Sequence, residues 1–331
     1  MSWGTRAAPG PPNPSARVRR LAPLAARVRV ARGGPALLLA AALGAPAALG
    51  QEPAGKDPGA AYREEIAAFR ARRDAGLRSP TGWLTVVGLS WLAEGENPVG
   101  TSRESRVSLP EGKAPATLGV IRVEKGTATF TAAPGVAVTS DGKPVATVAL
   151  KPDTAGSPTT LGHGSLTLFL IERGGRLGVR VKDREAEALK EFKGVETFPV
   201  DPAWRLVARF ERPATPRTID VPNVLGTTEK QDSPGTVVFS VAGKEHRLDA
   251  LAEDDRLFLV FGDETNTRET YGGGRFLYTA EPSDDGTVVV DFNRATNPPC
   301  VFTPFATCPL PPKGNRLPVR VTAGEKTYGQ H

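Results

Sequence analysis

The sequence predicts a mainly β fold: an antiparallel β-sandwich, followed by a second β-sheet or small barrel that shares its core, with one amphipathic helix near the N-terminus. Short runs of β-branched and aromatic residues recur about every ten residues between positions 95 and 183, separated by glycine-containing turns. Similar runs with short links follow position 199. Upstream of both, apolar residues recur at near-helical spacing among charged ones, which is typical of a helix packed on a sheet.

The predicted helix follows a flexible linker at residues 51–60 that is rich in Pro and Gly. Its apolar positions are Tyr62, Ile66, Phe69 and Leu77. The helix is expected to end near Gly76, and its many charged residues are expected to face water.

The strands of the predicted sandwich lie at residues 107–109, 118–123, 128–130, 136–139, 145–150, 165–172 and 177–181, after strand-like runs at 83–87 and 89–92. In the second half, strands are predicted at residues 204–211, 217–221, 235–241, 246–250, 257–261, 276–280 and 287–292. A short charged helix is predicted at residues 183–192, and Pro199 and Pro202 follow it. These prolines divide the chain into residues 61–198, the helix plus sandwich, and residues 199–331, the C-terminal β subdomain.

Residues 1–50 have the pattern of a signal peptide or basic leader. They contain seven arginines and no Asp, Glu or Lys, and an apolar run at residues 35–49 ends in small residues. That run is too short for a comfortable membrane span. We therefore expect cleavage near Gln51 and an exported protein, periplasmic or extracellular, with no membrane span after leader removal. A wrongly assigned start codon is the alternative for residues 1–32.

The net positive charge of the chain comes from this leader. Removing its seven arginines from the formal net charge of +6 leaves about −1 for the remaining chain. Nucleic-acid binding is therefore not expected, because it needs a basic surface on the working domain.

Two resemblances follow from these residues. The order of the sandwich strands, with a late pair at residues 161–174, resembles the forkhead-associated type of sandwich. The Ser-Arg and His arrangement that binds phosphothreonine in those domains has no counterpart here, so phosphopeptide binding is not expected.

The chain also resembles the bacterial family of unknown function DUF1684, over residues 62–326. The segments that carry this resemblance are Gly82-Trp83-Leu84, Gly88-Leu89-Ser90-Trp91-Leu92, Arg180-Val181-Lys182-Asp183, Tyr271 to Leu277, Asp291 to Arg294, Asn297 to Cys300, Cys308 to Pro312 and Asn315-Arg316-Leu317. Thr296 departs from the tyrosine expected there. The resemblance implies exported or cytosolic, largely β proteins with no assigned activity.

The two cysteines, Cys300 and Cys308, are predicted to form a disulfide, because the leader indicates an oxidising compartment. A zinc site with His163 and His246 is not predicted, since the ligand spacing matches no common zinc module. A nucleophilic Cys300 would need a histidine beside it and a reducing environment. No cofactor is predicted, because the glycine-rich segment at residues 271–275 precedes a strand rather than a helix.

The candidate ligand-binding residues lie in the second half, on two segments that a turn at residues 284–286 brings to the same end of a hairpin. They are Glu269, Tyr271, Arg275, Asp291, Asn293, Arg294 and Asn297. Carboxylates with guanidinium and amide donors suit a small polar molecule or envelope component. The alternative is structural: the acidic and basic members pair with one another and hold the proline-rich loop.

Two functions remain open at this point. In the first, the chain is a binding or envelope-associated module for a small polar ligand. In the second, it is a hydrolase of an envelope glycan or similar polar substrate, with Glu269 or Asp291 as general base and Arg275 stabilising charge. Carboxylates that are all tied to arginines would favour binding or pure structure.

Overall fold

The computed structural model describes residues 58–253 and 255–329, which lie within one compact unit, Lys56–His331. The predicted leader and most of the predicted linker lie outside the described residues. The boundary predicted near residue 199 stays a prediction. Within the described residues, no helix is both long enough and apolar enough to cross a membrane.

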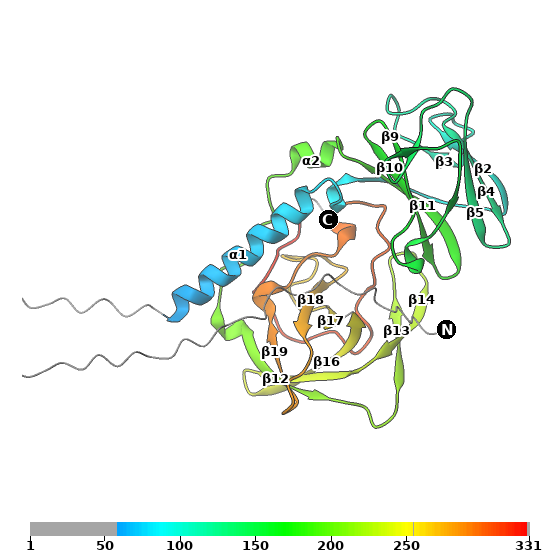
Figure 1. Cartoon of the computed structure of the whole chain (residues 1–331). Helices are drawn as coiled ribbons and strands as arrows, with labels where there is room; N and C mark the ends of the chain where they lie inside the picture. Colours follow the sequence, from blue (N-terminus) through cyan, green and yellow to red (C-terminus); the bar gives the residue numbers. More distant parts are fainter. Residues whose placement is uncertain (1–57, 254, 330–331) are drawn as a thin grey trace, which may run out of the picture. The chain divides into compact units, whose positions relative to one another are not determined.

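Helix α1 (Pro58–Arg78) is the predicted N-terminal helix and ends two residues after the expected position, ahead of Pro80. Ile66 and Leu77 are its buried apolar anchors, at 0% and 2% exposure. Eight of its other side chains are charged. In Figure 1, α1 runs beside the C-terminal strands. Tyr62 donates to Asp291, and Arg70 and Arg73 donate to the backbone carbonyls of Phe198 and Asn297.

The predicted sandwich is confirmed. One sheet has the order β1 (Val86–Trp91), β11 (Arg176–Asp183), β10 (Leu166–Arg173), β9 (Thr160–His163), β6 (Thr139–Ser140) and β7 (Lys143–Pro144). The other has the order β3 (Val107–Ser108), β2 (Gly95–Gly100), β4 (Gly119–Glu124), β5 (Thr127–Ala132) and β8 (Thr147–Leu150). All pairs are antiparallel except β2 with β3. Alternate residues of the strands, among them Ile121, Phe130 and Leu168, fill the core between the sheets.

The second half is a nearly closed, barrel-like antiparallel sheet. Its order is β18 (Arg275–Ala280), β17 (Arg256–Phe261), β16 (Lys244–Glu253), β15 (Gly235–Val241), β12 (Arg205–Glu211) and β19 (Thr287–Asp291). The two end strands approach each other, since the Thr279 hydroxyl donates to the Val289 carbonyl at 2.5 Å. Phe239, Phe261 and Phe292 meet in the enclosed core. A hairpin of β13 (Arg217–Pro222) and β14 (Thr228–Ser233) completes this half.

The remaining elements are short helices: α2 (Glu187–Glu191), and the 3-10 turns η1 (Trp83–Thr85), η2 (Asp153–Ala155), η3 (Pro202–Trp204), η4 (Phe292–Arg294) and η5 (Pro299–Val301). Residues 83–85 were predicted as strand. They form a turn because the Thr85 amide and hydroxyl both donate to the Gly82 carbonyl, at 3.2 and 2.6 Å.

The loop at residues 299–312 joins the two halves. The Thr303 hydroxyl donates to the Val86 carbonyl of β1 at 2.9 Å. Thr307 meets Arg180 of β11. The loop thus lies against both the sandwich and the barrel-like sheet.

Candidate functional site

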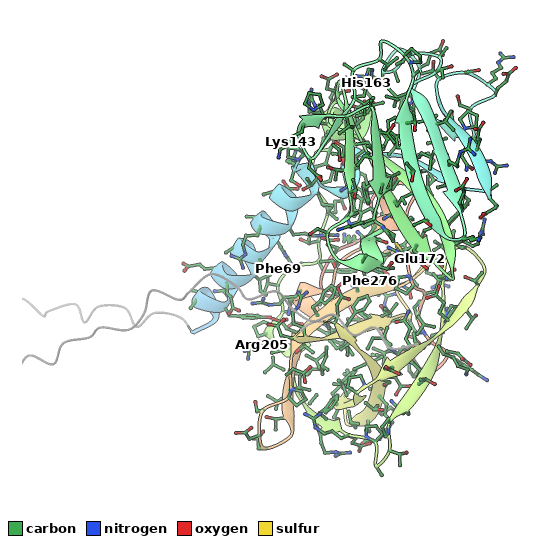
Figure 2. All side chains as sticks on the ribbon, turned by 45° about the vertical axis from the view of Figure 1, so that its right-hand side comes forward. Phe69, Lys143, His163, Glu172, Arg205 and Phe276 are labelled. Carbon is green, nitrogen blue, oxygen red and sulfur yellow. The ribbon has the colours of Figure 1, made fainter. Side chains whose placement is uncertain are left out.

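A cavity of about 360 Å³ lies between α1 and the C-terminal half, and we call it the α1 pocket. One face of the helix forms its outer wall. In Figure 2, Phe69 lies between α1 and the barrel-like sheet. The residues that line the pocket are Phe69, Arg70, Ala71, Arg73, Asp74, Leu77, Gly194, Val195, Thr197, Asn293, Ala295 and Glu325.

One wall of the pocket is formed by the ion pair of Arg73 and Glu325, whose charges neutralise each other. Arg73 Nε donates to Glu325 Oε1 at 3.0 Å, and its Nη2 donates to the Asn297 carbonyl at 3.0 Å. The second carboxylate oxygen of Glu325 accepts from the Asn297 amide at 2.6 Å. Because both partners are satisfied, this wall holds α1 in place and carries no net charge.

Arg70 lines the same pocket and forms no ion pair in the described part of the chain, although Glu325 attracts it electrostatically. Its Nη2 donates to the Phe198 carbonyl at 2.9 Å, while its buried Nε has no hydrogen-bond partner. Burial lowers the pKa of this guanidinium. The side chain therefore brings a positive charge to the wall of the cavity.

The floor of the pocket comes from η4 and the residue before it. Tyr62 donates its hydroxyl to Asp291 Oδ1 at 2.8 Å, and Asn293 Nδ2 donates to the Tyr62 oxygen at 2.9 Å. Asp291 also caps η4 by accepting from the Asn293 amide at 3.1 Å. Burial and the bond to Asp291 raise the pKa of Tyr62, so this phenol stays protonated.

The structure brings together only part of the predicted set. Asn293 lines the pocket, and Asp291 lies beneath it. Arg294 lies at the edge of η4 and pairs with Glu65 of α1 and, at 3.4 Å, with Asp291. Asn297 is buried behind the Arg73 wall, where its Nδ2 donates to the Lys326 carbonyl and its Oδ1 has no partner.

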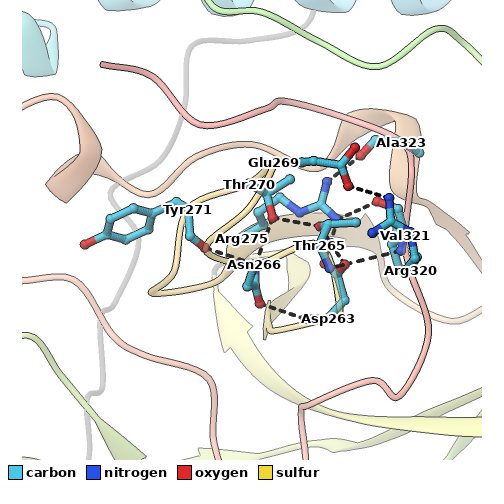
Figure 3. A network of polar contacts seen from close by, with 10 residues as sticks. All are labelled: Asp263, Thr265, Asn266, Glu269, Thr270, Tyr271, Arg275, Arg320, Val321 and Ala323. Atoms are coloured by element: carbon cyan, nitrogen blue, oxygen red, sulfur yellow. Dashed lines mark hydrogen bonds and ion pairs between the residues drawn. The ribbon is translucent and has the colours of Figure 1, made fainter. Parts of the chain in front are cut away.

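Arg275 points elsewhere, into a sealed network. Its side chain has no exposed surface; Nη2 donates to Asp263 Oδ2 at 2.7 Å and to the Val321 carbonyl at 2.9 Å, and Nη1 donates to the Ala323 carbonyl. Figure 3 shows the guanidinium enclosed by these groups, with the ring of Tyr271 pointing away from them. Arg275 is not among the residues that line the α1 pocket. The prediction that it faces one pocket together with Asn293 is therefore not met by this cavity.

The two carboxylates considered as general bases are both tied to arginines. Glu269 accepts from Arg320 Nη2 at 2.5 Å on the surface beside the Arg275 network. Asp291 is tied to Arg294 and to Tyr62. This arrangement favours binding or structure over hydrolysis.

The predicted disulfide is not formed in the structure. Cys300 and Cys308 are free thiols, although they are neighbours: the Cys300 amide donates to Cys308 Sγ at 3.1 Å. No group of three or more candidate metal ligands occurs among the described residues.

Of the residues that line the pocket, only Asn293 was among the predicted ligand-binding residues. Arg70 and Arg73 belong to the charged side of the helix, which the sequence pattern assigns to solvent, and Glu325 lies near the end of the chain. The one available signal was the density of arginines on a helix that also carries apolar anchors.

Comparisons with known proteins give one family and several solved structures, two of which are described below. Residues 190–326 match the family described as protein of unknown function DUF1684. An uncharacterized protein from Haloarcula marismortui, solved by solution NMR, is 32% identical, with 43% of this chain and 80% of that chain covered and a TM-score of 0.36. A forkhead-associated domain studied for phosphothreonine-dependent interactions is 18% identical, with 30% of this chain and 96% of that one covered and a TM-score of 0.21. No curated protein matches the chain.

Proposed function

The chain belongs to the DUF1684 family of proteins of unknown function, and we propose that it is a binding module for a small anionic ligand held in the α1 pocket. The observation that carries this proposal is the charge of Arg70. The other charged residues that line the pocket are neutralised within the protein: Arg73 pairs with Glu325, and Asp74 pairs with Arg78. Arg70 alone among them forms no ion pair: Glu325 attracts it electrostatically but is paired with Arg73, so these three side chains together keep one positive charge in excess.

The size and chemistry of the pocket limit the ligand. A cavity of about 360 Å³ lies at the small end of the range for small-molecule sites. Phe69 and Leu77 offer apolar surface, and Arg70 offers donors suited to a carboxylate or phosphate oxygen. A sugar or short metabolite that bears one such group fits this combination.

Export and an association with the cell envelope belong to the same proposal. They rest on the basic and apolar pattern of residues 1–50. The check is mass spectrometry of protein recovered outside the cytoplasm, for which we expect an N-terminus near Gln51. An N-terminus well before Arg32 in that protein contradicts the leader.

The binding proposal is tested by a thermal-shift screen of the whole protein with inorganic phosphate, acetate, and phosphorylated and carboxylated cell-wall sugars. At least one of them should raise the melting temperature of the wild type progressively as its concentration increases, because a ligand that binds only the folded state stabilises it. In Arg70→Met the shift should be lost.

Arg72→Met is the matched control, since Arg72 is an exposed arginine of the same helix that does not line the pocket. Its shifts should equal those of the wild type. The proposal fails if no anion in the screen shifts the wild type, or if Arg70→Met keeps the full shift.

A further inference from the structure

A groove of about 590 Å³ lies along one edge of the sandwich, and we call it the β1 groove. Strand β1 ends its sheet: it pairs with β11 on one side, and no strand of the described chain pairs with it on the other. Strand β3, which ends the second sheet, lies near β1. The groove is lined by Val87–Ser90 of β1 and by Ser108–Pro110 at the end of β3. The two sheets therefore leave an open seam at this edge.

The middle of β1 directs backbone groups toward this open seam. In an antiparallel pair, alternate residues bond to the partner strand, and the residues between them direct their N–H and C=O groups away from it. The Leu92 amide donates to the Leu177 carbonyl at 3.0 Å, which places Leu92 among the residues that bond to β11. Two positions earlier, Ser90 does the same. Leu89 and Trp91 therefore direct their backbone groups to the free edge.

Side chains cover the two ends of this edge but not its middle. At one end the Thr303 hydroxyl donates to the Val86 carbonyl at 2.9 Å. At the other, Arg106 Nη1 lies 3.5 Å from the Trp91 carbonyl. Within residues 58–253 and 255–329, no group bonds to the backbone N–H or C=O of Leu89. An unpaired donor and acceptor on an edge strand form a template for an added strand.

The groove offers apolar surface beside these backbone groups. Leu109 and Pro110 follow β3, and Phe305 comes from the loop at residues 299–312. Pro110 has no backbone N–H that it could donate across the seam. Side chains of an added strand alternate between its two faces, so every second one can contact this apolar surface. Backbone pairing together with contacts for alternate side chains is the way in which sheet edges bind extended peptides.

The charged residues of the groove have an excess of negative charge. Lys113 lies 2.7 Å from Glu185 and 3.6 Å from Asp183, so one lysine serves two carboxylates. Lys190 pairs with Glu187 at 2.9 Å. These are the charged side chains that line the groove, and three carboxylates against two lysines leave one negative charge in excess. A basic side chain of a bound peptide would neutralise it, whereas a second copy of this chain would bring the same excess.

We propose that the β1 groove binds an extended basic segment of a partner protein, which adds as a strand to the free edge of β1. Peptide backbone groups pair with the N–H and C=O of Leu89, apolar side chains contact Leu109 and Phe305, and a Lys or Arg meets the carboxylate of Glu185. The groove follows Val87–Ser90, roughly 13 Å of strand, so a segment of about four to six residues fills it.

This interaction goes beyond anion binding in the α1 pocket and does not depend on it, since no residue lines both cavities. The test begins with random peptides, about six residues long, displayed on phage and selected on the full chain. Enriched peptides should carry a Lys or Arg and apolar residues at every second position. Enrichment of acidic peptides, or of none, overturns the proposal.

Strand addition is tested by methylating each backbone nitrogen of the tightest peptide in turn. Methylation should weaken binding about tenfold at the residue that donates to Leu89, and should leave binding unchanged at its neighbours, because only alternate N–H groups of a strand face β1. On the protein, Leu89→Pro should bind about tenfold more weakly than Leu89→Ala, which keeps the N–H. Thermal melts of both variants check that they fold. If Leu89→Pro does not fold, the methylation pattern alone decides.

The charge preference is tested with Glu185→Gln, which should weaken binding of the basic peptide about twofold to fivefold. Glu191→Gln is the matched control, because Glu191 is an exposed residue of α2 that does not line the groove; its affinity should equal that of the wild type. Methylation without an alternating effect, or equal binding by Leu89→Pro and Leu89→Ala, overturns the proposal. A dimer in sedimentation experiments that the peptide dissociates would assign the groove to a second copy and overturn it as well.

Discussion

Arg275 and Arg70 each leave a buried Nε without a hydrogen-bond partner in the described structure, yet their surroundings differ in every other respect. Arg275 is sealed: Asp263 neutralises it and two carbonyls accept from its terminal nitrogens. Arg70 donates to a single carbonyl, forms no ion pair and lines a cavity. A buried arginine thus indicates a ligand site when it forms no ion pair and lines a cavity. It indicates a structural role when its charge is neutralised and no cavity adjoins it.

The energetics of the two regions should differ accordingly. Removing one member of a fully buried ion pair leaves the other charge without compensation in a medium of low polarity. Removing a cation that has no partner leaves no such charge behind. Substitutions can therefore separate a structural arginine from a binding one even before a ligand is known.

The largest expected effect is in the sealed region. Asp263→Asn should lower the free energy of unfolding by about 3 to 5 kcal/mol, because Arg275 then stays buried without its counter-ion. The measurement is urea denaturation at neutral pH.

Glu269→Gln is the control for this prediction, since its partner Arg320 is about half exposed and such pairs contribute roughly 0 to 1 kcal/mol. Equal losses of unfolding free energy in the two variants would mean that the Asp263 pair contributes no more than a surface pair. They would contradict the structural role assigned to Arg275.

A smaller effect is expected at high pH in the pocket region. Tyr62 has a raised pKa in the folded chain, from burial and the bond to Asp291, so its contribution is present below the ordinary phenol pKa of about 10 and is lost as the pH rises above it. The free energy of unfolding should fall above that pH, by at most about 1.4 kcal/mol per pH unit for each phenol involved.

This effect is checked by urea denaturation of wild type and Tyr62→Phe at pH values below and above about 10. The alkaline loss should be smaller in the variant. Part of the loss should remain in the variant, because burial also raises the pKa of the phenols of Tyr271, Tyr278 and Tyr328. An identical loss of unfolding free energy at high pH in both proteins would show that the hydrogen bond donated by the Tyr62 hydroxyl does not stabilise α1.

Much of the fold could be predicted from the sequence because most strands alternate apolar and polar residues and end at glycine turns. Among the strands that escaped prediction, two did so for clear reasons. β14 is polar throughout, and its partner β13 supplies the apolar face of the hairpin. β2 contains Pro98 and two glycines, which a sequence pattern assigns to loop.

The candidate site could be predicted only in part. Asp291, Asn293 and Arg294 follow one another in a polar motif, so their proximity is local and visible in the sequence. The contribution of α1 is not local: Tyr62 meets Asp291 across 229 positions. The direction of Arg275 could not be predicted either, because a strand residue at its end can face the core or the solvent, and only the register of β17 and β18 decides which.

The central claim is that Arg70, and not Arg275, presents its guanidinium to a ligand. NMR of the arginine Nε–H groups during titration with inorganic phosphate tests it most directly, because each group reports on its own surroundings. The account predicts that the Arg70 resonance moves with phosphate concentration while the Arg275 resonance stays in place. Movement of the Arg275 resonance alone, or of neither, contradicts it.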